Sequence, residues 1–493
     1  MEYDLTKQIC SYLDSHMMLP LIEFLKETSQ YPEDQINNAK ADILDQTGCC
    51  DFAINVYEAL GRDTSNLKQK KEKLENELDK LSKDCEYITQ FIEMKKQYRE
   101  QKEQQHQQHQ QQQQAATASG EEQPTTTPAV APVAPTITLG QVAEKTTPET
   151  LDSLYRLAKL SFEVGKYSAS RDYLEVFSLL TPYNKEKKLS ASWGILESDI
   201  LSLNWTSAIG DIKPLQDQID SNGLPVDQLY QRAWLIHRAL FVFFLSGQEN
   251  KSMFVDLLLD DKYLNAVQTT CPYILRYLAV AIITNKKKLQ SNLFQRQLNV
   301  LVRVIEQEGY VYSDPILSFI SSNYVKFNFE EAQTQLSLCE KIIANDYFLR
   351  GALEEFIESS RTCIFETYCN IHENIDIDML CKSLRIPSES SEKWIVEAIR
   401  NARFTAKIDS ANNQIKMFSQ HNNSYRQVMD KTKQLFNRGI EIVVGINESR
   451  TQLKKTGDRN KNRQNNNRTN NTTTPAAGAT TTTTATATPV TTA

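Results

Sequence analysis

Residues 388–418 read SESSEKWIVEAIRNARFTAKIDSANNQIKMF, and this stretch decides the fold class of the region around it. Its first half places apolar side chains three and four residues apart, which predicts an amphipathic helix that ends near Arg403. The apolar face of this helix comprises Trp394, Ile395, Ala398 and Ile399.

The second half of the stretch predicts a β-hairpin. Residues 404–409 alternate in polarity and meet residues 414–418 across an asparagine-containing turn, as hairpin strands do. The side chains expected on its inner face are Ile408, Ile415 and Met417. Two more helices are expected before it, the second capped by Asp376. Three helices followed by a hairpin form a winged helix-turn-helix, which we assign to residues 346–420.

The region before the winged helix, residues 148–345, carries a degenerate helical repeat. Residues 154–182 read LYRLAKLSFEVGKYSASRDYLEVFSLLTP, which predicts a helical hairpin that stops at a proline. Its second helix contains Tyr167 and Ala169, and a similar pattern with Trp205 and Ala208 follows about 38 residues later. Such spacing, with aromatic and small residues at the helix contacts, is typical of a TPR-like solenoid. We therefore predict an all-α chain in which the solenoid leads into the winged helix.

The N-terminal part predicts short amphipathic helices over residues 1–62 and one long helix over residues 63–103. From Leu74 onward the long helix has apolar residues at alternating spacings of four and three, the a/d seam of a coiled coil. This seam packs either on the chain's own body or on a partner helix. The low-complexity segment that follows it favours the partner.

Two segments lack the apolar residues that a core requires. Residues 104–147 form a Gln-, Thr- and Pro-rich insert, and residues 456–493 form an Asn- and Thr-rich tail; both are expected to be disordered. The stretch 450–468 holds seven Arg or Lys residues and one Asp. Two interpretations stay open: a solvated, disordered end, which we favour, and a weak contact with RNA phosphates.

Between the winged helix and the tail, residues 421–455 predict a final helix with an apolar side. Because this stripe lies beyond a complete domain, another surface must cover it, and we expect a helical bundle with other subunits. Together with Trp394 and the three hairpin side chains, its residues make up the predicted interface: Leu435, Phe436, Ile440 and Val443.

Nothing in the sequence predicts catalysis, a cofactor or a metal site. The phosphate-binding, nucleophile-elbow and zinc-protease motifs are absent, and the nine cysteines include no C-x-x-C pair. His237 lies in an apolar, aromatic helix and is interpreted as a buried, satisfied histidine. The net charge of −7 does not favour nucleic acid, and no apolar run is long enough for a membrane span. The acidic, polar N-terminus is unlike a secretion signal, so we expect a cytoplasmic protein and leave a nuclear pool open.

The predicted architecture resembles that of PCI-domain scaffold subunits, with the PCI domain at about residues 235–420. Four stretches closely resemble the E-subunit family of eukaryotic translation initiation factor 3: residues 2–25, 231–244, 263–286 and 392–410. The likeness runs from residue 2 to about residue 453 and excludes the insert and the tail.

The resemblance implies a non-catalytic scaffold in the PCI/MPN core of that factor, with the factor's D subunit as a further contact. It also implies a contribution, through the whole complex, to binding of the small ribosomal subunit, to formation of the preinitiation complex and to recruitment of mRNA. The alternatives are a PCI subunit of the signalosome or the proteasome lid, and a winged-helix regulator that binds nucleic acid. Neither a small-molecule substrate nor a membrane is implied.

Overall fold

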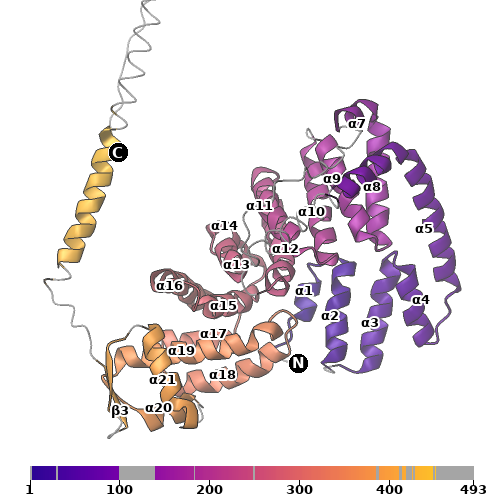
Figure 1. Cartoon of the computed structure of the whole chain (residues 1–493). Coiled ribbons are helices and arrows are strands. Elements are labelled where there is room, and N and C mark those ends of the chain that lie inside the picture. Colours follow the sequence, from indigo (N-terminus) through magenta and orange to yellow (C-terminus); the bar gives the residue numbers. More distant parts are fainter. Residues whose placement is uncertain are drawn as a thin grey trace, which may run out of the picture. The chain divides into compact units, whose positions relative to one another are not determined.

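The computed structural model describes residues 3–28, 31–98, 139–181, 184–247, 250–384, 388–402, 404–409, 413–417 and 428–447, with the single residues 101, 425 and 450. These residues form helices and one small sheet, so the predicted fold class is confirmed (Figure 1). The chain divides into two compact units, residues 1–417 and 418–493. None of the described helices is long and apolar enough to span a bilayer.

The first unit begins with five helices at the N-terminus. They are α1 (Thr6–Cys10), α2 (Ser15–Glu27), α3 (Glu33–Gln46), α4 (Cys50–Ala59) and α5 (Ser65–Asp84). Asp14 caps α2, because its side chain accepts a hydrogen bond from the His16 backbone N–H. Figure 1 shows α2 to α5 side by side at one end of the molecule.

The prediction of a single long helix over residues 63–103 is wrong. Helix α5 ends at Asp84, Cys85 leaves the helical backbone with φ −108° and ψ 18°, and residues 86–98 form a separate helix. The break lets the second half of the seam pack on the chain's own solenoid. Ile88 and Phe91 are buried there in one apolar cluster with Leu157. This half of the seam is therefore internal rather than partner-facing.

The insert predicted over residues 104–147 ends earlier than expected. Residues 102–138 lie outside the described part of the chain, but residues 139–145 form α7 (Leu139–Lys145), whose Val142 is fully buried. Val142 packs in the same cluster as Ile88, and the Lys145 ammonium lies 4.3 Å from the centre of the Tyr87 ring. These contacts join the short helix to the solenoid and to the helix of residues 86–98.

Helices α8 to α18 form the solenoid, and α19 is the first helix of the winged helix assigned to residues 346–420 (Figure 1). These helices are α8 (Pro148–Glu163), α9 (Tyr167–Leu180), α10 (Lys185–Leu201), α11 (Trp205–Ser221), α12 (Pro225–Leu245), α13 (Lys251–Leu258), α14 (Asp261–Thr270), α15 (Ile274–Asn285), α16 (Ser291–Glu308), α17 (Pro315–Tyr324), α18 (Phe329–Ala344) and α19 (Leu353–Ile371), with a 3-10 turn, η2 (Arg350–Ala352), before α19. Every residue of α15 is buried, because α13, α16, α17 and α19 pack around it.

Three hairpin turns of the solenoid repeat one local structure. Each turn has three residues: the first has a left-handed φ, the second precedes the helix, and the third is an aromatic residue that begins the helix. The three turns are Gly165–Tyr167, Leu203–Trp205 and Phe327–Phe329. The left-handed φ values are +91°, +60° and +52°. Glycine adopts this conformation without strain, whereas Leu203 and Phe327 adopt it at a steric cost. The spacing of aromatic residues in the sequence therefore reflects a repeated turn.

The winged helix contains one more strand than predicted. The elements after α19 are β1 (Asn374–Asp376), α20 (Ile377–Leu384), α21 (Ser388–Ala402), β2 (Ala406–Asp409) and β3 (Gln414–Met417). The antiparallel sheet has the order β1-β3-β2, so the predicted hairpin gains β1 on the other side of β3. Ile375 pairs with Ile415, and both are buried.

Within the second unit, residues 428–447 are helical and all of their side chains are exposed. The described residues match the final helix predicted over 421–455, while the tail predicted over 456–493 lies outside them.

Candidate functional site

Helix α21 packs against α19 within the winged helix through one apolar face. Ile395 and Ala398 are buried. Trp394 is half-buried, and its ring packs edge-on against Phe365 of α19 with centroids 5.7 Å apart. It also lines a groove of about 950 Å³ formed with α19 and the segment after α15. Part of the Trp394 surface therefore stabilises the fold, and part remains accessible.

The three predicted side chains of the hairpin have different surroundings. The register pairs Ile408 with Ile415, so both lie on the same face of the sheet, as expected. Ile415 belongs to the central strand and is fully buried in the chain's own core, whereas Ile408 on edge strand β2 is 37% exposed. Met417 is half-buried against the core. Of the three, Ile408 is the most accessible to a partner.

The helix of residues 428–447 carries its apolar side chains in two rows with heptad spacing. Val428, Leu435 and Ile442 form one row, and Met429, Phe436 and Val443 form the other. The predicted interface residues on this helix have exposed fractions between 48% and 68%; they are Leu435, Phe436, Ile440 and Val443. Nothing in the described part of the second unit covers these rows, which is unusual for so much contiguous apolar surface.

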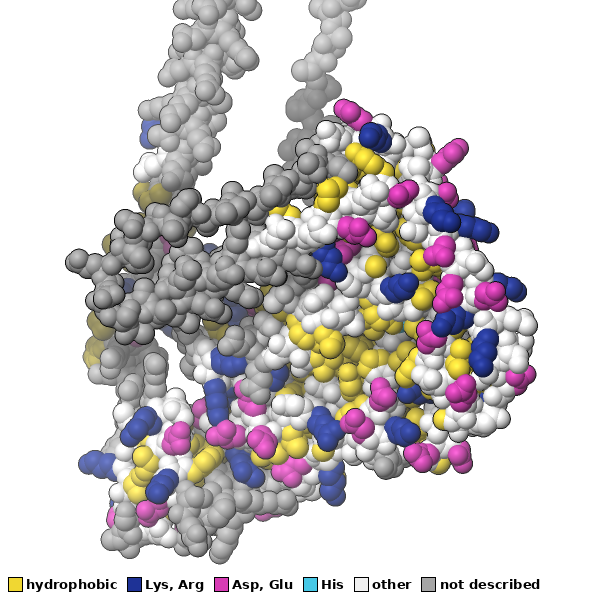
Figure 2. Space-filling model, turned by 45° about the vertical axis from the view of Figure 1, so that its right-hand side comes forward, with side chains coloured by type: hydrophobic (Ala, Val, Ile, Leu, Met, Phe, Trp, Pro, Cys, Tyr) yellow, Lys and Arg dark blue, Asp and Glu magenta, His cyan; other side chains and the backbone are white. Residues whose placement is uncertain are grey.

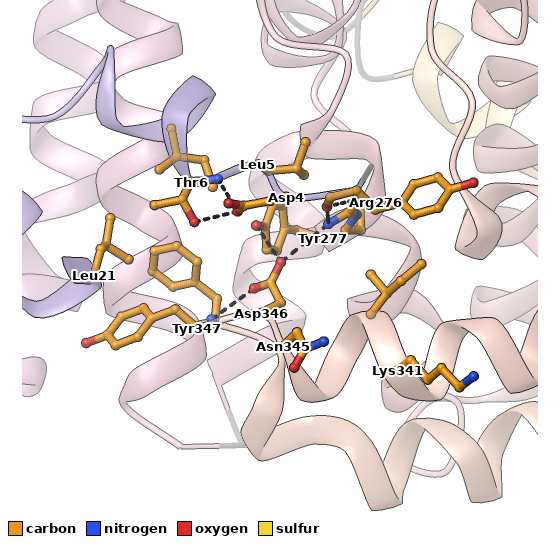
Figure 3. A pocket seen from close by; sticks show the side chains of 14 residues that line it. Asp4, Leu5, Thr6, Leu21, Arg276, Tyr277, Lys341, Asn345, Asp346 and Tyr347 are labelled. Carbon is orange, nitrogen blue, oxygen red and sulfur yellow. Dashed lines mark hydrogen bonds and ion pairs between the residues drawn. The ribbon is translucent and has the colours of Figure 1, made fainter. Parts of the chain in front are cut away.

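A buried charge cluster, not predicted from the sequence, fixes the N-terminal segment on the solenoid (Figure 3). The Arg276 guanidinium of α15 donates to Asp314 (Nε to Oδ2, 2.6 Å) and to the backbone carbonyl of Tyr3 (3.0 and 3.1 Å). It also lies 3.6 Å from Asp346. Burial raises the pKa of both carboxyl groups above the ordinary range, although Arg276 opposes the shift.

The only sequence signal for this cluster is an arginine within the apolar run of residues 274–283. A buried arginine needs carboxylate partners, but the sequence does not say which ones. The cavity beside the cluster measures about 140 Å³ and includes Asp4, whose carboxylate accepts hydrogen bonds from Thr6 and from the Tyr31 hydroxyl at 2.6 Å. These contacts make the cluster a structural lock.

His237 has the role expected from the sequence. Its Nδ1 lies 2.6 Å from the Ala233 carbonyl oxygen and its Nε2 lies 2.7 Å from the Tyr273 hydroxyl. The ring stacks on Tyr12 with centroids 4.4 Å apart. Burial lowers the pKa of His237 to about 4, so the ring is neutral at physiological pH. Both nitrogens are engaged inside the fold, and the histidine is structural.

Among the residues that the structure describes, no group of three or more His, Cys, Asp or Glu side chains could hold a metal ion. All nine cysteines are free thiols, and burial raises the pKa of Cys10 and Cys271 to about 11. A thiol with so high a pKa is a poor nucleophile at neutral pH.

Comparison with known proteins agrees with this architecture. Family models match at residues 4–119, described as the eIF3 subunit 6 N terminal domain, and at residues 328–419, described as the PCI domain. The chain is 65% identical over 483 residues to the E subunit of eukaryotic translation initiation factor 3 from Dictyostelium discoideum, covering 94% of this chain and 91% of the relative.

More distant relatives have the same name. The E subunit of Arabidopsis thaliana is 33% identical over 469 residues, covering 92% of this chain and 98% of the relative. The E subunit of Yarrowia lipolytica is 32% identical over 444 residues, covering 90% and 99%. The likeness spans the N-terminal helices, the solenoid and the winged helix, and it distinguishes this chain from subunits of the signalosome and the proteasome lid. The chain belongs to the E-subunit family of eukaryotic translation initiation factor 3, and it carries the PCI domain.

Proposed function

We propose that this chain joins the PCI/MPN core of initiation factor 3 by burying two surfaces against sibling subunits. The first is the apolar side of the helix of residues 428–447, and the second is the β2 edge of the winged helix. The observation that carries the proposal is the exposure of Leu435, Phe436, Ile440 and Val443 on a helix with heptad apolar rows.

The energetic argument for the helix is direct. Complete burial of one such side chain contributes roughly 1.5–3 kcal/mol. Since these four side chains are about half to two-thirds exposed, covering them would contribute roughly 4–8 kcal/mol in total. Heptad rows of this kind pack into the grooves of neighbouring helices, which favours a helical bundle as the form of the contact.

The second surface depends on the order of the strands. Strand β2 lies at an edge of the sheet, where a strand of another chain can pair with it. Ile408 on β2 and the accessible part of Trp394 provide apolar contacts at the two sides of the module. This surface fixes orientation, while the helix provides most of the apolar area.

Through the assembled factor, the chain supports binding of the small ribosomal subunit, formation of the preinitiation complex and recruitment of mRNA in the cytoplasm. The D subunit of the factor is one further contact in this proposal. The basic stretch 450–468, of which only Arg450 lies within the described residues, adds at most a weak, salt-dependent contact to RNA.

Recognition of nucleic acid by α21 is disfavoured by its charges. Its exposed side carries Glu392, Lys393, Glu397 and Arg400, so it repels phosphate about as much as it attracts it. The face in Figure 2 likewise mixes acidic and basic side chains around gathered hydrophobic ones.

Affinity purification tests the proposal. The tagged chain, treated with ribonuclease, is expected to recover the other subunits of initiation factor 3, and a chain lacking residues 421–455 is expected to recover fewer of them. A control variant removes apolar surface elsewhere, at Tyr310 and Val311, which are 99% and 72% exposed in the loop after α16. Equal recovery with the deleted chain, or equal loss with the control, would refute the helix as the main contact.

A further inference from the structure

A second accessible surface lies on the solenoid, away from the winged helix. A groove of about 340 Å³ runs between the start of α2, the end of α3 and helices α8 to α10. Aromatic rings form its walls: Tyr155, Phe162 and Trp193. Gly194 lies on its floor, where a Cβ would come 2.6 Å from Leu174 Cδ1, so α9 and α10 pack closely beneath the groove.

The groove is acidic. Asp14, Glu163 and Glu197 line it together with Lys159 and with His16, whose pKa is lowered by burial. The Glu197 carboxylate is neutralised by Arg238, whose Nε donates to it at 2.6 Å. Among the described residues, no lysine or arginine lies within ion-pair distance of Asp14 or Glu163. Asp14 already caps α2, so Glu163 is the carboxylate of the groove that remains available to a basic ligand.

The aromatic surface continues beyond the groove onto α12. The Trp193 ring lies 6.5 Å from that of Trp234, nearly perpendicular to it, and Trp234 is 42% exposed. Tyr230 and Val226, also exposed, follow on the same face of α12 at four-residue spacing. Exposed tryptophan and tyrosine rings are the side chains most enriched at binding hot spots, and their faces attract cations.

We propose that this groove and the α12 surface bind an extended, arginine-bearing segment of a partner protein. The chain's own Arg238 already lies 5.0 Å from the centre of the Trp193 ring, so a guanidinium group of the segment stacks on the exposed Trp234 instead. A second guanidinium group pairs with Glu163, while apolar side chains of the segment contact Tyr230 and Val226. The aromatic walls suit an extended backbone, and the acidic rim repels the phosphates of RNA. The proposal does not depend on the helix of residues 428–447, so either can fail alone.

Fluorescence anisotropy on the full-length chain tests the groove. The probe is a fluorescein-labelled peptide of about six Arg–Pro pairs, with a Glu–Pro peptide and an oligouridylate as comparisons. Glu163→Lys combined with Trp234→Ala is expected to weaken binding of the Arg–Pro peptide by about tenfold or more. A matched control, Glu354→Lys with Tyr310→Ala, makes the same charge reversal and a similar aromatic truncation on exposed residues elsewhere. The control is expected to change the affinity for the Arg–Pro peptide by less than about twofold.

Three outcomes would overturn the proposal. They are no binding of the Arg–Pro peptide, equal loss in the groove variant and the control, or tighter binding of the oligouridylate at the same residues. Circular dichroism of both variants separates loss of binding from loss of fold. A groove variant that unfolds is replaced by Glu163→Gln alone, which keeps the side-chain volume and is expected to reduce both affinity and its salt dependence.

Discussion

Replacing Arg276 by methionine is expected to destabilise the first unit strongly. Methionine keeps the apolar stem but removes every hydrogen bond of the guanidinium to Asp314 and Tyr3. Arg276 and Asp314 are each only 1% exposed, so the Asp314 carboxylate would remain buried without its partner. Breaking a buried ion pair in this way costs about 3–5 kcal/mol.

Urea unfolding followed by circular dichroism measures this loss, and amide hydrogen exchange locates it. Residues 3–10 are expected to exchange faster in Arg276→Met, because the Tyr3 carbonyl loses its anchor. Combining Arg276→Met with Asp314→Asn removes the orphaned charge and is expected to recover about 1–3 kcal/mol. The control Arg350→Met breaks an exposed pair with Glu27, separated by 3.8 Å, and is expected to cost less than about 1 kcal/mol.

The pH dependence provides a second criterion. Burial already raises the pKa of Asp314, and loss of Arg276 raises it further. The folded variant then binds a proton more tightly than the unfolded chain, so its free energy of unfolding should recover as the pH falls. A loss below about 1 kcal/mol in Arg276→Met, or unchanged exchange of residues 3–10, would refute the role of the cluster as a lock.

Two further predictions concern stability. Burial raises the pKa of Asp199 to about 6 and also raises the pKa of its neighbour Asp211, so the pair takes up a proton on folding at mildly acidic pH. Between pH 7.5 and 5 the free energy of unfolding should gain about 1 kcal/mol from this pair, and Asp199→Asn combined with Asp211→Asn should abolish that gain in urea titrations at the two pH values. Gly48→Ala should lower the free energy of unfolding by about 1–3 kcal/mol, because the added Cβ would lie 2.9 Å from the Glu163 carbonyl oxygen. The control Gly210→Ala, which has open space around it in α11, should be neutral or stabilising. An equal effect of the two substitutions in thermal unfolding would contradict the close approach at Gly48.

The elements with strong periodicity could be predicted from the sequence. The apolar face of α21, the hairpin strands and the turn aromatics Tyr167 and Trp205 follow directly from the spacing of side chains. Strand β1 could not be predicted, because three residues are too few to show alternation and it pairs with a strand about 40 residues away. The break at Cys85 also escaped prediction, since the heptad pattern continues through it and only tertiary burial of Ile88 and Phe91 explains it.

The apolar character of the proposed interface residues follows from the sequence, but their exposure does not. Ile408 and Ile415 have the same character and face, yet only the sheet order makes one accessible and buries the other. The solenoid groove was invisible in the sequence, because Asp14, Glu163 and Trp193 come from three helical segments that meet only in the fold. Long-range contacts of this kind carry no local periodicity.

The most direct test of the account is the affinity of the full-length chain for its purified sibling subunits when the final helix loses its apolar rows. The variant replaces four exposed side chains by serine: Leu435, Phe436, Ile440 and Val443. The account predicts an affinity at least about a hundredfold weaker by analytical ultracentrifugation, consistent with the loss of several kcal/mol of burial, and an unchanged urea unfolding curve for the first unit. Assembly with undiminished affinity would contradict it.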